Sequence, residues 1–128
     1  MKITHIALWT EKLEELRTFY LTYFKGKSNE KYTNSKKGFE SYFISFQGET
    51  SLEIMRSVHV TTLPFPNPHI GLCHFAFSLA NREEVDSLTE RLRSDGYTVL
   101  SEPRITGDGF YESVILDPDS NQVELVTK

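Results

Sequence analysis

Two histidines and two glutamates stand at matching places in the two halves of this chain. His5 lies in ITHIALW and His74 in LCHFAFS, while Glu53 lies in SLEIM and Glu124 in NQVELV. Imidazole nitrogens and carboxylate oxygens together bind a divalent ion such as Zn²⁺, Ni²⁺, Co²⁺, Mn²⁺ or Fe²⁺. If the halves pack about a pseudo-twofold axis, the four side chains meet at one metal site. Spacing alone leaves a second interpretation open, in which each is an ordinary structural residue of a strand.

The segments around these residues alternate between apolar and other side chains, which predicts β-strands with two unlike faces. In the first segment, Ile6 and Leu8 point away from His5. The apolar faces of the other three segments comprise Phe75, Phe77, Leu52, Ile54, Val123 and Leu125. We expect these faces to pack on helices and the opposite faces to line a concave, partly apolar pocket. A carboxylate on such a wall is costly unless it is paired, hydrogen-bonded or bound to a metal.

Each half of the chain reads as strand–helix–strand–strand–strand. The helical patterns cover 11–24 and 82–96, with Thr10 and Asn81 at N-cap positions and Gly96 at a C-terminal cap. The predicted strands are 3–9, 27–32, 39–46 and 51–55 in the first half, and 72–78, 97–102, 110–116 and 121–126 in the second. These elements predict an α+β fold in which two βαβββ modules form a half-barrel sheet that encloses a cleft, with the helices on its outer face.

The length of 128 residues fits one domain, 1–128, with module 1 at about 1–57, a linker at about 58–70 and module 2 at about 71–128. Hydrophobic residues make up 38% of the chain, and its net charge is −4 without a basic run. This composition predicts a folded cytoplasmic protein that binds neither nucleic acid nor a membrane. Cys73 is the only cysteine, so no internal disulfide can form, and we expect it to be a small buried apolar residue.

Three longer motifs give the sequence a resemblance to a known family. They are THIALWTEKLEELRTFY, GLCHFAFSL and DPDSNQVELV. Together they resemble the vicinal oxygen chelate superfamily, which includes glyoxalase I, fosfomycin-resistance enzymes, extradiol dioxygenases and bleomycin-binding proteins. The last motif is similar to the family's DPDGN-x-x-E-L ending, with Ser120 in place of the glycine. The motifs are specific for the fold and much less specific for the reaction.

The resemblance implies that His5, Glu53, His74 and Glu124 hold one divalent transition metal, as in glyoxalase I. It implies a metal-dependent lyase or isomerase that acts on a small oxygenated substrate through a metal-stabilised enolate or oxyanion. Glu124 is then the catalytic base, and Glu53 is its pseudo-symmetric counterpart. Relatives often form homodimers, so we expect a homodimer. Whether the modules pair within one chain or are exchanged between two chains stays open.

One position departs from the family's glyoxalase I pattern. Trp9 stands where bacterial glyoxalase I carries an arginine that helps to hold glutathione. An indole ring cannot pair with a carboxylate, so we expect a substrate other than glutathione-linked methylglyoxal.

Two alternative functions stay open. One is an extradiol dioxygenase or a fosfomycin-type thiol transferase, whose three ligands would be His5, His74 and Glu124. The other is a metal-free protein that binds an aromatic drug.

Further residues are candidates for contacts with the substrate. They are Trp9, Tyr42, Met55, Arg104, Tyr111 and Glu112. For each of them a plain exposed strand or loop position is the competing interpretation. His59 and His69 belong to the connecting segment rather than to a matched strand, so we do not expect them to be metal ligands.

Overall fold

The computed structural model describes residues 1–61 and 71–128 of the chain. The chain divides into two compact units, Met1–Pro64 and Phe65–Lys128, and each is described by itself. Within the described residues, the first unit contains β1 (His5–Trp9), α1 (Leu13–Tyr23), β2 (Lys27–Ser28), β3 (Tyr32–Asn34), β4 (Phe39–Ser45) and β5 (Ser51–Ser57). The second contains β6 (His74–Ser78), α2 (Arg82–Ser94), β7 (Val99–Ile105), β8 (Tyr111–Leu116) and β9 (Gln122–Thr127). His69 and most of the predicted linker lie outside the described residues.

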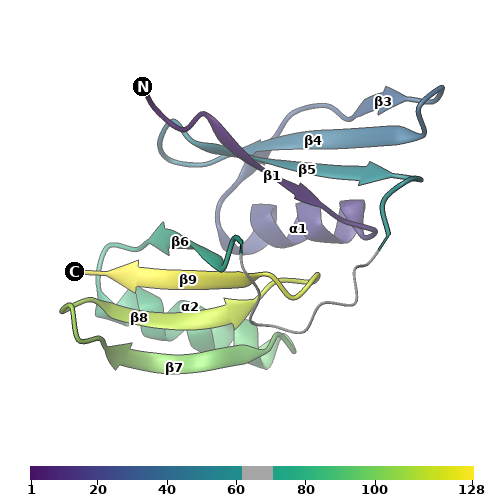
Figure 1. Cartoon of the computed structure of the whole chain (residues 1–128). Helices are drawn as coiled ribbons and strands as arrows, with labels where there is room; N and C mark the ends of the chain where they lie inside the picture. The colour runs from purple at the N-terminus through teal and green to yellow at the C-terminus, as the bar shows by residue number, and fades with distance from the viewer. Residues whose placement is uncertain (62–70) are drawn as a thin grey trace. The chain divides into compact units, whose positions relative to one another are not determined.

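Each unit folds its strands into one open sheet with the same connectivity (Figure 1). The order is β1-β5-β4-β2 in the first unit, with β3 also paired to β4, and β6-β9-β8-β7 in the second. The first strand of each unit pairs in parallel with the last one, and the other pairs are antiparallel. The predicted α+β fold of two βαβββ modules is therefore confirmed.

Two of the predicted strands differ from the structure. The segment predicted as one strand over 27–32 forms β2 and β3 as separate pieces, because at Asn29 the side-chain oxygen takes the place of the backbone carbonyl in the ladder, while the Asn29 N–H still donates to the Phe43 carbonyl at 3.1 Å. The Phe43 N–H donates to Asn29 Oδ1 at 2.8 Å. In the second unit, the strand predicted over 97–102 is β7, Val99–Ile105, and its pairing with β8 is interrupted by register shifts.

One helix covers one face of each sheet (Figure 1). The helices and the strands beneath them supply the buried apolar core, whose largest members are Leu16, Phe19, Tyr20, Ile44, Ile54, Val85, Leu92, Ile115, Val123 and Leu125. Alternate side chains of β5 and β9 point to this core, as their alternating sequences predict. The other face of each sheet is left for the ionisable residues.

The ends of the helices follow the sequence signals only in part. Asn81 is the N-cap of α2, as predicted, and its Oδ1 accepts from the Glu84 N–H at 2.9 Å. Gly96 follows the C-cap of α2 with a φ of 92°, in the region that favours glycine. Thr10 is not the N-cap of α1, since its Oγ1 accepts from Lys12, the residue that takes that position.

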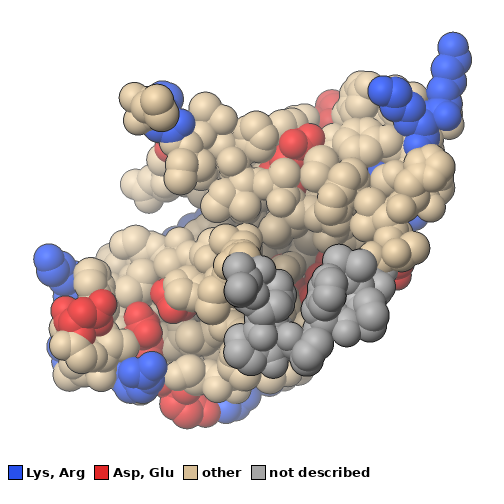
Figure 2. Space-filling model, in the orientation of Figure 1, with Lys and Arg blue, Asp and Glu red and all other residues tan. Residues whose placement is uncertain are grey.

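Charged side chains of both signs are scattered over the face seen in Figure 2, and the described residues form no continuous basic patch on that face. No helix within 1–61 or 71–128 is long and apolar enough to cross a membrane. Cys73 is exposed rather than buried, because it precedes the first residue of β6 and lies outside the packed sheet.

Candidate functional site

His5 and Glu53 lie side by side on the face of the first sheet that α1 does not cover. In the parallel register of β1 and β5, Ala7 pairs with Glu53, so His5 lies two residues before it on the neighbouring strand. The Nε2 of His5 is 3.8 Å from Oε2 of Glu53. The buried neighbours of Glu53 in the chain, Leu52 and Ile54, point the other way, into the core.

The second unit repeats this arrangement with the same register. Ala76 of β6 pairs with Glu124 of β9, and His74 Nε2 is 3.2 Å from Glu124 Oε1. Both glutamates are largely covered, with 18% of the Glu53 side chain and 17% of the Glu124 side chain exposed, whereas both imidazoles are more than 40% exposed. Each unit therefore presents one nitrogen and one oxygen donor at matching positions.

The surroundings of Glu124 disfavour its charge. Burial is the largest cause that raises the pKa of Glu124 above its ordinary value, and the negative charges of Glu112 and Asp108 raise it further. His74 and Arg104 act in the opposite direction without cancelling the shift. A cation bound beside Glu124 would offset the cost of keeping this carboxylate ionised.

The separation of the nitrogen and oxygen donors in each His–Glu pair is compatible with binding to a transition-metal ion. Two ligand atoms about 2.1 Å from one ion lie roughly 3.0–3.4 Å apart when the angle between them is about 90–109°. The His74–Glu124 separation of 3.2 Å falls in that range, and the His5–Glu53 separation of 3.8 Å needs a small side-chain adjustment. Among the described residues no group of three or more His, Cys, Asp or Glu is close enough to hold an ion. The joint site of four ligands thus remains a prediction.

Aromatic side chains flank the pair of the first unit. Phe43 of β4 pairs with Glu53, and its ring meets the His5 ring edge-on with centroids 5.5 Å apart. Trp9 meets Phe39 in the same way at 6.2 Å, and Met55 pairs with Trp9 across β1 and β5. The sequence analysis did not single out Phe39 and Phe43, although the alternation FESYFIS places both on the face of Glu53.

Charged side chains flank the pair of the second unit. Glu112 of β8 pairs with Val126 of β9, so it lies on a strand next to that of Glu124, and Arg104 of β7 pairs with Glu112 one strand further away. Arg104 is exposed, and its Nε donates to Ser101 Oγ at 3.4 Å. Asp108, in the turn before β8, was not predicted, and its charge acts on Glu124.

The two tyrosine candidates lie on the wrong face for the predicted role. Tyr42 pairs with Ile54, is buried, and donates its hydroxyl to both carboxylate oxygens of Glu14 in α1 at 3.1 Å. Tyr111 donates to Asp86 Oδ1 of α2 at 2.7 Å. In both cases the ring packs between sheet and helix while the hydroxyl reaches a carboxylate at the edge. Neither tyrosine shares the face of the His–Glu pairs.

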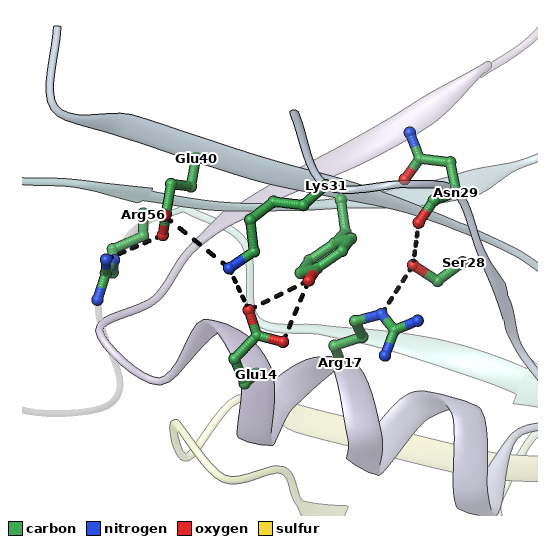
Figure 3. A network of polar contacts seen from close by, with 8 residues as sticks. Glu14, Arg17, Ser28, Asn29, Lys31, Glu40 and Arg56 are labelled. Carbon is green, nitrogen blue, oxygen red and sulfur yellow. Dashed lines mark hydrogen bonds and ion pairs between the residues drawn. The ribbon is translucent and has the colours of Figure 1, made fainter. Parts of the chain in front are cut away.

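The buried Tyr42 belongs to a polar network that ties α1 to the sheet (Figure 3). Glu14 forms an ion pair with Lys31, which also lies 3.9 Å from Glu40. Glu40 in turn pairs with Arg56 at 2.9 Å. This network lies on the helix side of the sheet and takes no part in the candidate site.

Comparison with known proteins identifies the family. Residues 2–125 match the family described as Glyoxalase/Bleomycin resistance protein/Dioxygenase superfamily. The chain is 32% identical over 130 residues to the uncharacterized protein YqjT of Bacillus subtilis (strain 168), with 95% of each chain covered.

Solved structures share the fold. A glyoxalase family protein from Enterococcus faecalis is similar at a TM-score of 0.80 and 23% identity, covering 98% of this chain and 97% of that one. Glyoxalase I from Zea mays is similar at a TM-score of 0.79 and 21% identity; the match covers 99% of this chain but only 44% of the maize chain. The repeated His–Glu pairs thus occur on the fold and in the sequence context of one family, and the chain belongs to the Glyoxalase/Bleomycin resistance protein/Dioxygenase superfamily.

Proposed function

We propose that the chain is a metal-dependent, glyoxalase-like enzyme of the lyase or isomerase type that acts on a small oxygenated substrate. The observation that carries this proposal is the repetition of one His–Glu pair, in the same strand register, in both units. A structural role would explain one such pair, but it gives no reason for both units to keep the same pair on the face that no helix covers.

His5, Glu53, His74 and Glu124 would hold one divalent transition ion between them. When bound, the ion would supply Lewis-acid stabilisation of negative charge on the substrate's oxygens. The four protein ligands are two neutral nitrogens and two carboxylate oxygens, so they would neutralise the charge of a divalent ion. The substrate's oxygens would complete the coordination of the ion.

Glu124 is the ligand that would be released from the ion to take a proton from the substrate's carbon. Its pKa is raised by burial and by neighbouring carboxylates, which makes it a stronger base than an exposed glutamate. Glu112 on the neighbouring strand β8 and Arg104 on β7 beyond it would bind polar groups of the substrate. Glu53 is the counterpart of Glu124 in the first unit.

Proton abstraction can be tested without knowing the natural substrate. We expect the Zn²⁺- or Ni²⁺-loaded protein to catalyse exchange of carbon-bound protons for deuterium in a panel of α-hydroxyketones, ketoaldehyde thiohemiacetals and epimerisable acids, followed by proton NMR in D₂O. Exchange should fall by roughly 10²–10⁴-fold in Glu124→Gln, the range for loss of a general base. Glu49→Gln is the control, because Glu49 is exposed and pairs only with Lys2 among the described contacts. Exchange that survives in Glu124→Gln would contradict the assignment of the base.

The aromatic residues beside His5 favour a second candidate, a protein that binds an aromatic compound without metal. That alternative predicts binding that is unchanged by EDTA and by Glu124→Gln. The dioxygenase and thiol-transferase alternatives predict that Glu53→Ala still binds its metal, because Glu53 is not one of their three ligands. The proposed four-ligand site predicts that this variant loses most of its metal affinity.

A further inference from the structure

The sheet face that carries His5 and Glu53 continues into a surface of four aromatic rings, here called the aromatic face, made up of Trp9, Tyr32, Phe39 and Phe43. The ring of Phe39 meets Trp9 and Tyr32 edge-on, with centroids 6.2 Å and 6.0 Å away. Trp9 is 49% exposed, although it is a large apolar residue at the end of β1. Edge-to-face contacts hold these rings in fixed orientations and leave part of the indole surface free.

The aromatic face carries little charge. The remaining strand residues that share it by register are Ala7, Ser41, Ser45, Ser51, Ser57, Met55, Asn34 and Lys27. Lys27 pairs with Ser45, at the end of the sheet away from Trp9. The nearby cations Lys31 and Arg56 form ion pairs with Glu14 and Glu40 instead (Figure 3). The strands of the first unit therefore place no basic side chain beside Trp9 that could hold an anionic group.

The second unit shows that the His–Glu pair does not require such surroundings. Ser78 ends β6 as Trp9 ends β1, and both stand four residues after the histidine of their unit. Val126 takes the place of Met55 after the glutamate. Two units with the same pair and the same register thus differ in what lies beside the pair. The aromatic face is therefore not a by-product of the fold.

We infer that the substrate carries a planar aromatic group next to its vicinal oxygens, and that Trp9 is the main residue that selects it. Trp9 lies two residues beyond Ala7, the register partner of Glu53, which is about 7 Å along the strand. A ring joined directly to the oxygenated carbon would span that distance. This inference rests on the proposed function, because the His–Glu pairs must hold the oxygens for the ring to reach Trp9.

Two hydroxamates test the inference. Benzohydroxamate and acetohydroxamate chelate metals through the same two oxygens and differ only in a phenyl or a methyl group. In titration calorimetry of the Zn²⁺-loaded protein, we expect benzohydroxamate to bind at least about tenfold more tightly, because its ring buries apolar area and packs on the indole. The ratio of the two affinities, benzohydroxamate over acetohydroxamate, should fall to about twofold or less in Trp9→Ala and stay near the wild-type value in Trp9→Phe. Ser78→Ala, at the matching place in the second unit, should leave it unchanged.

Trp9 also supplies a direct readout, since it is the only tryptophan of the chain. Benzohydroxamate should change its fluorescence, and acetohydroxamate at equal occupancy should change it far less. The fluorescence change and the ratio of the two hydroxamate affinities in the wild type test whether Trp9 selects an aromatic ring even if Trp9→Ala fails to fold.

The outcomes separate this inference from the proposed function. Equal, EDTA-sensitive binding of both hydroxamates would overturn the aromatic substrate and leave the metal site standing. Equal loss of both probes in Trp9→Ala would also overturn it, because Trp9 would then support the site without selecting the ring. Absence of EDTA-sensitive binding of either probe would overturn the proposed function, and the inference with it.

Discussion

At the scale of single residues, Glu124 is a carboxyl group whose ionisation the fold opposes, because burial and two neighbouring carboxylates raise its pKa. Because its pKa is raised in the folded protein, its contribution to stability is greatest at low pH, where it is protonated in both states. That contribution is lost as the pH rises from the unfolded value of about 4.3 through the raised folded value.

Because the raised pKa of Glu124 lowers the stability of the folded protein as the pH rises, it gives a prediction for the metal-free protein. In urea unfolding with EDTA present, Glu124→Gln should be more stable than the wild type at pH 7, and the difference should shrink towards pH 4. Adding Zn²⁺ should reverse the order at pH 7, because only the wild type keeps its full set of ligands. A metal-free wild type that is the more stable protein at pH 7 would contradict the burial of this carboxylate.

Alternation along the strands was enough to predict both His–Glu pairs, since parity fixes the face of every strand residue. The sequence analysis made Tyr42 a candidate for contact with the substrate, whereas in the structure Tyr42 shares the buried side of β4 with Ile44. The partner of the Tyr42 hydroxyl, Glu14, belongs to a helix. No local pattern reveals such a contact, because it depends on how the helix packs on the sheet.

At the scale of elements, the two helices end differently. Gly96 after α2 and Lys25 after α1 both have positive φ, 92° and 55°. Lysine pays a steric cost in that region that glycine avoids. An added Cβ at Gly96 would meet no atom within 4 Å among the described residues, so any cost there comes from the backbone alone.

We therefore predict opposite effects from a matched pair of variants. Lys25→Gly should raise the free energy of unfolding by about 0.5–1 kcal/mol, and Gly96→Ala should lower it by about 1 kcal/mol. Urea denaturation of both variants beside the wild type measures the difference. Destabilisation by Lys25→Gly would show that the lysine side chain makes a contact worth more than the backbone strain.

The beginning of α2 provides a separate prediction. Asn81→Ala removes the side-chain oxygen that accepts from the Glu84 N–H, so it should cost about 1 kcal/mol. The same substitution at Thr10 removes a hydrogen bond to Lys12 but no N-cap. Circular dichroism during thermal unfolding would compare Asn81→Ala with Thr10→Ala. An unchanged unfolding midpoint in Asn81→Ala would contradict the role of Asn81 as the N-cap of α2.

Periodicity predicted both helices, and the capping signal predicted the start of α2 at Asn81, because both signals act within a few residues; the cap of α1, Lys12 rather than Thr10, was missed. The division of 27–32 into two strands was missed because it depends on the hydrogen bond between Asn29 and Phe43, which are far apart in sequence.

At the scale of the whole molecule, the proposal requires each site to draw one His–Glu pair from each unit. Both units could belong to one chain, or each to a different chain of a homodimer. Mixing the variants His5→Ala and His74→Ala distinguishes these cases. If the units are exchanged between chains, a mixed dimer contains one intact site and one without either histidine, so metal binding returns to half in the isolated mixed dimer and to about a quarter in an equimolar, randomly paired mixture. If each chain builds its own site, mixing restores none.

The central claim is that one ion is shared by ligands from both units, and metal content measured by elemental analysis tests it most directly. Protein purified without chelator and reconstituted with Zn²⁺ should hold about one ion per chain. His5→Ala and His74→Ala should each lose that ion, although they alter different units, while His59→Ala, which alters an exposed histidine outside both pairs, should retain it. Absence of metal in the wild type, or metal retained after loss of either unit's histidine, would contradict the shared site.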